Sequence, residues 1–161
     1  MIDTPSGANF SRCRRYRYTL WRRWDADRRL VMVIGLNPST ADARRNDPTI
    51  RRCIGFARDW GCGGLVVTNL FAFRATYPSD LKAASDPVGP RNDAWIRRMA
   101  RQVDVVVAAW GNDGAWLGRS ARLQRILSGR LHCLRLNHSG EPAHPLYLPA
   151  GLIPIQWRAE N

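Results

Sequence analysis

Lysine is almost absent from this sequence: Lys82 is the one lysine among 25 basic residues, so arginine carries nearly all of the positive charge. This argues against an enzyme that forms a Schiff base with its substrate, because that chemistry needs a reactive amine. Acidic residues are also few, 13 in all, and the formal net charge is +12. Such a surface favours a polyanion such as nucleic acid, since guanidinium groups match phosphate geometry. A preference for arginine codons in a GC-rich genome is the alternative explanation.

Other absences exclude whole classes of protein. No apolar run approaches the length of a membrane-spanning helix, and the N-terminal residues lack the apolar segment of a secretory signal, so we expect a cytoplasmic protein without a membrane partner. The phosphate-loop and dinucleotide patterns GxxxxGK[ST] and GxGxxG are also missing, so we expect no nucleotide cofactor. The cysteines have no pair at the close spacing of a zinc or iron–sulfur site: Cys13, Cys53, Cys62 and Cys133. We expect reduced thiols and no metal, with a cluster assembled in space as the alternative.

The pattern of apolar segments predicts the fold class. A chain of 161 residues with 45% apolar content supports one core, so we expect a single domain over residues 1–161. Apolar segments alternate with helical ones, which predicts an α/β fold: a three-layer αβα sandwich with a central, mostly parallel four-stranded sheet. The segment 16–24 alternates large apolar and basic residues and predicts an additional N-terminal antiparallel edge strand. The predicted strands are 30–36, 65–73, 103–111 and 131–136, and the predicted helices are 49–60, 92–101 (capped by Asn92 or Asp93) and 117–127.

Polar residues stand at the predicted carboxyl ends of these strands, where ligands bind in open α/β sheets. Asn37 follows the first buried strand, and Pro38 fixes the turn after it. Asn69 interrupts an otherwise apolar strand, and a buried amide needs hydrogen-bond partners, which neighbouring backbone or the edge of a base could supply. The remaining residues of this kind are Gly111, Asn112, Asn137, His138 and His144. Four such features on successive strand ends suggest a site.

The order of these motifs resembles the uracil-DNA glycosylase superfamily. GLNP follows the first buried strand, an asparagine lies within the second, the third ends in WG, HP follows the fourth, and PIQW comes near the end of the chain; the resemblance covers Val31 to Arg158. The sequence is also similar to a family of small bacterial and phage proteins with the motifs LNPSTAD, DPTIRRC, NLFAFRAT and HPLYL. The first resemblance implies a uracil-DNA-glycosylase-like fold and hydrolysis of the N-glycosidic bond of a base flipped out of DNA.

The resemblance also implies roles for single residues. Asn37 would orient the attacking water, Asn69 would read the edge of the flipped pyrimidine, and His144 would donate a hydrogen bond to the base oxygen on which negative charge gathers. From their chemistry, Asp42 or Asp47 could supply a stronger base near Asn37. Asp47 precedes Pro48 and alternatively caps the next helix.

Two departures from the superfamily pattern bear on the substrate. The strict uracil enzymes have a tyrosine after the proline of the first motif, which excludes 5-substituted bases, whereas this chain has Ser39. The small side chain predicts room for a 5-modified pyrimidine, such as a hydroxymethylated or glucosylated base of phage DNA, and a role in antiviral defence. The family also stacks an aromatic residue on the base, but none occurs between residues 38 and 55. The replacements we consider are Arg44, Arg45, Phe71 and Trp110.

We therefore expect a monomeric, monofunctional DNA glycosylase that binds duplex DNA. Leu146 and Tyr147 lie where the superfamily inserts a wedge into the duplex. Arginines near predicted helix starts are candidate phosphate contacts, with ordinary solvated arginines as the alternative: Arg44, Arg45, Arg51, Arg52 and Arg119. Two other functions stay open. One is N-glycoside hydrolysis or transfer on free nucleosides or nucleotides, and the other is a nucleic-acid-binding module without catalysis, since asparagine activates water more weakly than aspartate does.

Overall fold

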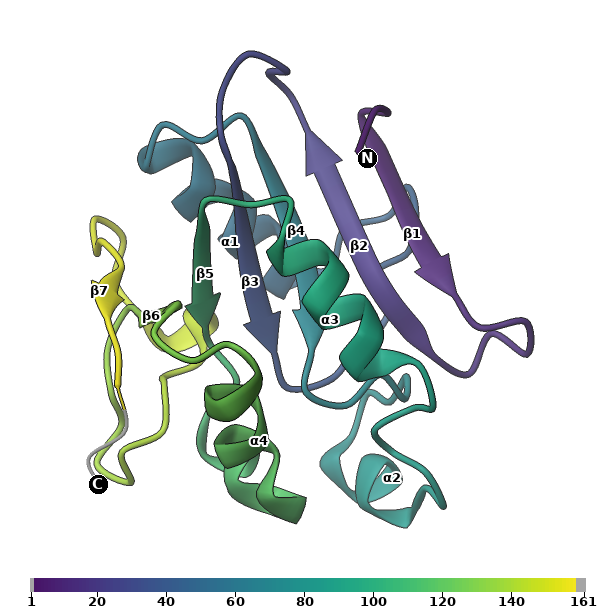
Figure 1. Ribbon diagram of the computed structural model, residues 1–161. Helices are drawn as coiled ribbons and strands as arrows, with labels where there is room; N and C mark the ends of the chain where they lie inside the picture. The colour runs from purple at the N-terminus through teal and green to yellow at the C-terminus, as the bar shows by residue number, and fades with distance from the viewer. Residues whose placement is uncertain (1, 159–161) are drawn as a thin grey trace.

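A seven-stranded mixed sheet forms the centre of the protein (Figure 1). The structure is a computed structural model that describes residues 2–158. The strands lie in the order β1-β2-β4-β3-β5-β6-β7. Their bounds are β1 Ser6–Phe10, β2 Arg17–Arg23, β3 Leu30–Gly35, β4 Gly64–Asn69, β5 Val105–Ala108, β6 Leu131–Cys133 and β7 Ile155–Gln156. The α/β class predicted from the sequence is confirmed.

The four strands predicted from apolar runs are the parallel core of this sheet, β4-β3-β5-β6, but the predicted sheet was incomplete. The segment 16–24 does form an antiparallel strand, β2, yet β2 is not at the edge, because β1 pairs along its outer side. At the opposite edge β7 pairs antiparallel with β6. β1 has small or polar residues before Phe10, and β7 has only two residues, both exposed, so neither carries the apolar pattern by which strands are predicted.

Helices cover both faces of the sheet and give three layers (Figure 1). On one face Ile50 and Phe56 of α1 pack with Val33 of β3 in one buried cluster. On the other face Ile96 of α3 and Leu123 of α4 belong to a second cluster, around Ile34. Side chains of β3 alternate between the two clusters, as the period of two in a strand requires. The helices are α1 Pro48–Asp59, α2 Pro78–Ala83, α3 Asn92–Ala100 and α4 Arg119–Ile126, with 3-10 helices η1 Asn112–Gly118 and η2 Pro145–Tyr147.

A β-bulge lies at the start of β2. Thr19 and Arg17 face consecutive residues of β1, so Tyr18 between them has no partner across the ladder. A bulge of this kind locally breaks the alternation of side chains. Tyr18 stacks on Trp95 of α3, with ring centroids 6.4 Å apart, whereas Arg17 reaches the loop before α1 and donates to the Ala41 carbonyl at 3.0 Å. The bulge thus places an arginine on the α1 face of the sheet.

The helix starts agree with the sequence only in part. Asp47 caps α1 by accepting a hydrogen bond from the Ile50 N–H at 2.9 Å, as predicted, and Pro48 occupies the first turn. Neither Asn92 nor Asp93 caps α3: its N-cap is Arg91, and both predicted caps bond to other elements instead. No helix within residues 2–158 is both long enough and apolar enough to cross a membrane.

Candidate active site at the carboxyl ends of β3 and β4

A cavity of about 130 Å³ lies between the carboxyl ends of β3 and β4 and the start of α1. Its walls are apolar, from Val33, Val67, Ile50, Cys53 and Ala109. Its polar lining comes from Arg17, Asn37, Ser39, Asp47, Thr49, Asn69 and His144. Five residues predicted from the sequence therefore meet here from distant segments: Asn37, Ser39, Asp47, Asn69 and His144. A larger depression of about 450 Å³ lies elsewhere, between α4 and Trp157, and includes none of these residues.

His144 is held as a neutral hydrogen-bond donor. It is the N-cap of η2, and its Nδ1 accepts the Leu146 N–H at 3.3 Å. Burial lowers the pKa of His144 below its ordinary value, and the charge of Asp47 opposes this only in part. The ring is therefore neutral at neutral pH, with its proton on Nε2, because Nδ1 acts as an acceptor. Nε2–H is the donor that His144 can offer to a group in the cavity.

Asn69, the last residue of β4, presents an amide whose orientation is fixed. Its Oδ1 accepts a hydrogen bond from Nη2 of Arg17 at 3.3 Å. Its Nδ2 lies against Gly35 of β3, where a Cβ atom would come within 2.9 Å of it. The glycine leaves the space that the amide occupies. Asn69 thus directs its oxygen to Arg17 and its N–H donors toward β3, beside the cavity.

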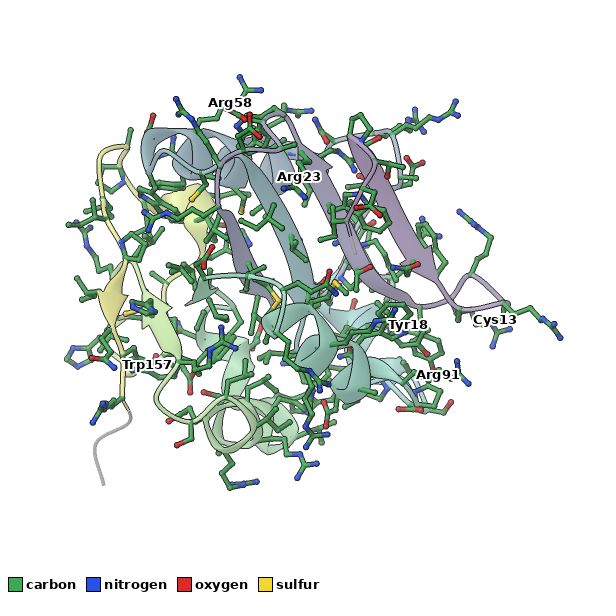
Figure 2. The ribbon with its side chains drawn as sticks, turned by 45° about the horizontal axis from the view of Figure 1, so that its top comes forward. Cys13, Tyr18, Arg23, Arg58, Arg91 and Trp157 are labelled. Atoms are coloured by element: carbon green, nitrogen blue, oxygen red, sulfur yellow. The ribbon has the colours of Figure 1, made fainter. Side chains whose placement is uncertain are left out.

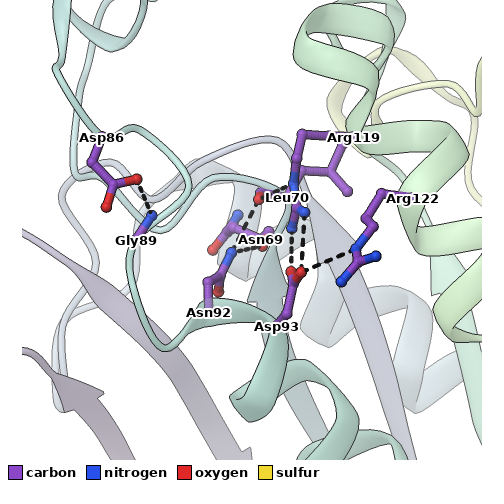
Figure 3. A network of polar contacts seen from close by, with 8 residues as sticks. All are labelled: Asn69, Leu70, Asp86, Gly89, Asn92, Asp93, Arg119 and Arg122. Carbon is purple, nitrogen blue, oxygen red and sulfur yellow. Dashed lines mark hydrogen bonds and ion pairs between the residues drawn. The ribbon is translucent and has the colours of Figure 1, made fainter.

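A second polar network supports the end of β4 from the opposite face (Figure 3). Nδ2 of Asn92 donates to the carbonyl oxygens of Asn69 at 2.8 Å and Leu70 at 3.0 Å. Nε of Arg119 also donates to the Leu70 carbonyl at 3.0 Å, and its Nη2 pairs with Asp93 at 2.6 Å. Backbone carbonyls that leave a sheet need partners when they are buried. The network therefore anchors the backbone from which the Asn69 side chain projects.

Asn37 offers an acceptor. Its Nδ2 donates to the carbonyl of Pro38 at 3.1 Å and to that of Ala75 at 2.7 Å. Both amide hydrogens are used on backbone, so Oδ1 is the atom of this side chain that can meet a ligand or a water molecule. That arrangement suits the orientation of water by hydrogen-bond acceptance.

The two candidate carboxylates separate in the structure. Asp47 is buried, lines the cavity, and caps α1 through Oδ1, so the helix-cap interpretation is confirmed for a residue that is also in the site. Asp42 is not part of the cavity lining: its Oδ1 accepts the backbone N–H groups of Arg44 at 2.9 Å and Arg45 at 2.8 Å. These backbone hydrogen bonds lower the pKa of Asp42 below its ordinary value. The prediction that Asp42 could serve as the base is wrong, because the loop uses its carboxylate to hold a turn.

One of the four cysteines lines the cavity. Cys53 lines the cavity, but burial raises the pKa of its thiol to about 12, so it remains protonated and acts as an apolar wall. All four cysteines are free thiols, of which three are buried and Cys13 is exposed. Within residues 2–158 no group of three or more His, Cys, Asp or Glu side chains could hold a metal ion.

Two aromatic residues expected at the base lie elsewhere. Phe71 is fully buried and packs on Trp116, with ring centroids 5.0 Å apart. Trp110 is buried against Trp157, and its Nε1 donates to Glu141 at 2.7 Å. Both belong to the cluster on the α3 face, opposite the cavity, so the prediction that either stacks on a base is wrong. The other strand-end amides, Asn112 and Asn137, also lie outside the cavity lining. They bond to each other, since Nδ2 of Asn137 donates to Oδ1 of Asn112 at 3.0 Å.

The five arginines predicted to contact phosphates divide into two groups. Arg44, Arg45 and Arg51 are exposed around the start of α1. Arg52 is half-buried, stacks over Phe56 and donates to the Leu148 carbonyl, so it ties η2 to α1. Arg119 is buried in its ion pair with Asp93, and the prediction that it contacts phosphate is wrong. Its charge is used to bind a carboxylate and a carbonyl of its own chain.

The side chains after His144 are exposed, although they are apolar. The exposed fraction is 42% for Leu146 and 85% for Tyr147. Both belong to η2, which packs beside the start of α1, so they stand at the same end of the sheet as the cavity. Their exposure is consistent with a part of the surface that contacts another molecule.

Sequence reasoning missed Arg17, Gly35 and Thr49 as parts of the cavity. Arg17 was interpreted only as a basic residue of a half-exposed strand, yet it is 2% exposed. Gly35 ends an apolar strand two residues before Asn37 of the NP motif, which was a usable signal, because glycine in a strand often marks a close approach of neighbouring groups.

A family model described as "Protein of unknown function (DUF1643)" matches residues 17–146. The matched segment begins at the first residue of β2 and ends within η2, and it contains all the polar residues of the cavity. No match was found among curated proteins or among solved structures. Since the match covers most of the 161 residues, the chain belongs to the DUF1643 family.

Proposed function

We propose that this protein is a monofunctional DNA glycosylase that hydrolyses the N-glycosidic bond of a flipped pyrimidine, with a uracil-DNA-glycosylase-like fold. One observation carries the proposal: a small cavity at the ends of parallel strands holds a neutral histidine donor, an oriented amide and a free amide acceptor in His144, Asn69 and Asn37. In the reaction, water oxygen bonds to the sugar C1′, and the electron pair of the glycosidic bond leaves with the base. The proton released from water finally resides on the base.

The donors suit the charge that develops on the leaving base. Negative charge collects on the pyrimidine oxygens as the bond breaks, and donors already in position stabilise it without reorganisation. Nε2–H of His144 and Nδ2–H of Asn69 are such donors, because their other polar atoms are occupied. The Oδ1 of Asn37 would orient the attacking water, and Asp47, in the same lining, is the carboxylate available to draw its proton.

The size of the cavity favours a base presented by DNA over a free nucleotide. Pockets that enclose whole small ligands measure about 300–1,000 Å³. The 130 Å³ here suits a single ring, with sugar and phosphate left outside. Within residues 2–158 the lining includes no phenylalanine, tyrosine or tryptophan, so Val33, Val67 and Ile50 would contact the faces of the ring. Ser39 in the lining leaves room for a small 5-substituent, which favours a hydroxymethylated over a glucosylated base and supports a role in defence against phages with modified DNA.

Arginines at the same end of the molecule supply a surface for the DNA backbone. Arg12, Arg14 and Arg15 are exposed in the turn between β1 and β2. Cys13, which is labelled in Figure 2, marks this turn, and the turn lies at the opposite end of the sheet from Arg58. The guanidinium groups of Arg14 and Arg74 both lie over the Phe10 ring, at 4.2 and 4.9 Å. None of these four arginines is in an ion pair within the described residues. Uncompensated positive charge at the same end of the sheet as the cavity fits a phosphate backbone.

The test is mass spectrometry of bases released from duplex DNAs that contain uracil, 5-hydroxymethyluracil, 5-hydroxymethylcytosine or its glucosylated form. We expect the wild type to release one of these bases and Asn69→Ala to release it at least about 10²-fold more slowly, the usual effect of removing one such donor. The matched control is Asn137→Ala, which removes an amide at the same end of the sheet but outside the cavity lining, and should keep wild-type activity.

Failure to release a base from any of these DNAs would leave the other two functions, which salt dependence separates. A DNA-binding module without catalysis predicts a log affinity that falls by about 0.9 per phosphate contact against log salt, unchanged in His144→Ala. An enzyme acting on free nucleotides predicts weak DNA binding with a flat salt response.

A further inference from the structure

Arg17 is a buried cation beside the cavity, and the hydrogen bonds of the fold do not account for it. Its exposed fraction is 2%, its Nη1 donates to the Ala41 carbonyl at 3.0 Å and its Nη2 to Asn69 at 3.3 Å. Nε is buried and has no hydrogen-bond partner in the described structure. Burial lowers the pKa of this guanidinium to about 10, against the opposing charge of Asp47, so it still carries a full charge at neutral pH. Arg17 takes part in none of the ion pairs within residues 2–158.

Arg22, on the same strand, shows what a purely structural arginine looks like here. It too is buried, at 8% exposure, and it too bonds to the loop before α1. Its Nε donates to the Asn46 side chain at 2.9 Å, and its terminal nitrogens donate to the carbonyls of Trp21, Asp42, Ala43 and Arg45. Arg22 thus uses all its nitrogens, whereas Arg17 makes two bonds with its five N–H donors. Holding the loop explains Arg22 but leaves the buried charge of Arg17 unexplained, and a buried charge is costly unless it is compensated.

The contact between Arg17 and Asn69 gives that charge a consequence for the site. A charged donor on Oδ1 fixes which end of the amide faces the cavity, because the reverse orientation would set two donors against each other. It also polarises the amide, which makes Nδ2–H a stronger donor, since hydrogen bonds in a chain reinforce each other where water is excluded. The positive charge itself stands in the cavity lining, next to the Asn69 amide.

We propose that Arg17 is an electrostatic positioning residue, which orients and polarises the Asn69 amide so that negative charge on the departing base is stabilised. The inference rests on the proposed glycosylase function and adds to it the source of the electrostatic stabilisation. Arg17 keeps its proton throughout: the electron pair of the glycosidic bond moves to the base, and the proton that neutralises the base comes from the attacking water. The charge acts most strongly on a base that leaves as an anion.

This role differs from a structural one in its dependence on the leaving group. A base whose anion is intrinsically more stable needs less help, so removing Arg17 should slow the release of a more acidic base less. Single-turnover release is therefore measured for matched bases in one DNA sequence: uracil and 5-fluorouracil for a uracil-type substrate, or 5-hydroxymethylcytosine and 5-formylcytosine for a cytosine-type one. The variants are Arg17→Met, Arg17→Lys and, as the matched control, Arg22→Met.

We expect Arg17→Met to slow release of the less acidic base about 10²-fold and of the more acidic base clearly less, about tenfold. Arg17→Lys keeps the positive charge but not the two-pronged guanidinium group. It should therefore recover part of the rate, and its rate should depend on the acidity of the leaving base almost as little as that of the wild type. Arg22→Met should change both rates by one common factor. Thermal unfolding of each variant shows whether it folds, and where Arg17→Met does not, Arg17→Lys carries the test through the same ratio of rates.

Equal slowing of the two bases in Arg17→Met, or no slowing, would overturn the electrostatic role, although the enzyme itself remained a glycosylase. The rate of Arg17→Lys could instead depend on the acidity of the leaving base as strongly as that of Arg17→Met. The two-pronged geometry of the guanidinium, and not its charge, would then matter, and the electrostatic role would also be overturned. A wild type that releases neither base is a different result, because it removes the proposed function and this inference with it.

Discussion

The two faces of the sheet differ in how their polar groups bond at the end of β4. On the α1 face the Asn69 side chain borders a cavity whose polar groups keep free hydrogen-bonding capacity, among them Nε2 of His144 and Oδ1 of Asn37. On the α3 face the same residue's carbonyl is held by Asn92, within a solid core in which Arg119 pairs with Asp93 (Figure 3). One face leaves donors for a ligand, and the other uses its donors on the protein itself.

The difference shows how a strand end can have an anchored backbone and still leave its side chain free to form hydrogen bonds. An amide that is to bind a ligand needs a fixed backbone, yet bonds made by the side chain to other elements would use up its donors. Here the backbone is fixed from one face and the side chain remains available on the other. Arg119 and Arg17 follow the same division, since Arg119 is satisfied by a carboxylate and a carbonyl, whereas Arg17 bonds to the amide at the cavity.

The largest effect is expected on the α3 face, from Arg119→Met. Loss of the guanidinium leaves Asp93 without its buried partner and removes a donor from the Leu70 carbonyl. Breaking a buried pair in this way costs about 3–5 kcal/mol of unfolding free energy. Urea unfolding measures it, with Arg122→Met as the control, because Arg122 pairs with the same Asp93 but is 47% exposed. That control should lose less than about 1 kcal/mol, and equal losses in the two variants would mean that the α3 face is not the support described here.

A smaller effect, on the α1 face, is expected from Gly35→Ala. The new methyl group would lie 2.9 Å from Nδ2 of Asn69, so the amide must shift. Misplacing a catalytic group by about 1 Å can cost about 10²-fold in rate, and we expect a loss of that order in base release with an unfolding midpoint close to that of the wild type. Gly55→Ala is the control, because a Cβ there meets nothing within 4 Å and alanine favours the helix. Full activity of Gly35→Ala would argue against a role of the Asn69 amide.

Much of the α1 face was predictable, because the motifs at strand ends carry polar residues into known places. Asn37, Asn69 and His144 all reach the cavity. Trp110 was wrongly predicted to stack on the base, although the alternation of side chains along β5 places it on the α3 face. Val107 and Ala109 belong to the α1 face, so Trp110 must point the other way, but a strand that is apolar on both faces shows no visible period.

Other misplacements came from features that a sequence does not display. Phe71 is two residues after Asn69, so the alternation of a strand would put both side chains on the same face. However, β4 ends at Asn69, and Phe71 packs in the buried cluster on the α3 face. Arg17 depends on the bulge at Tyr18, and nothing in the alternation of segment 16–24 marks an extra residue. Arg119 was matched by type alone, and its partner Asp93 lies in a segment whose proximity only the fold reveals. Asp42 was misplaced for a local reason, because its carboxylate accepts the N–H groups of Arg44 and Arg45 in its own turn.

The smallest expected effect is on the pH dependence of the unfolding free energy, which differs between the two faces. His144, on the α1 face, has a folded-state pKa below its ordinary value of 6.5, because burial disfavours the charged ring. The unfolded chain then binds the proton more readily, so this contribution to stability is complete above pH 6.5 and is lost as pH falls through 6.5 toward the folded-state pKa. In His144→Asn the cap acceptor for η2 is kept but titration is removed. We expect the variant to lack the decline in unfolding free energy that the wild type shows as pH falls below 6.5.

On the α3 face the corresponding group is Asp93, and its window lies elsewhere. Burial raises the pKa of Asp93, but the hydrogen bond and charge of Arg119 outweigh burial, so the net pKa is below its ordinary value of 3.8. Its contribution is therefore present above pH 3.8 and is lost only as pH falls through the lower, folded-state value. Unfolding free energies measured against pH should show His144→Asn altering the slope only in the upper window, and Arg119→Met altering it only in the lower one. A change of slope in the upper window for Arg119→Met would show coupling between the two faces only if it disappeared in the double variant with His144→Asn, because Asp93 without Arg119 keeps the burial that raises its pKa.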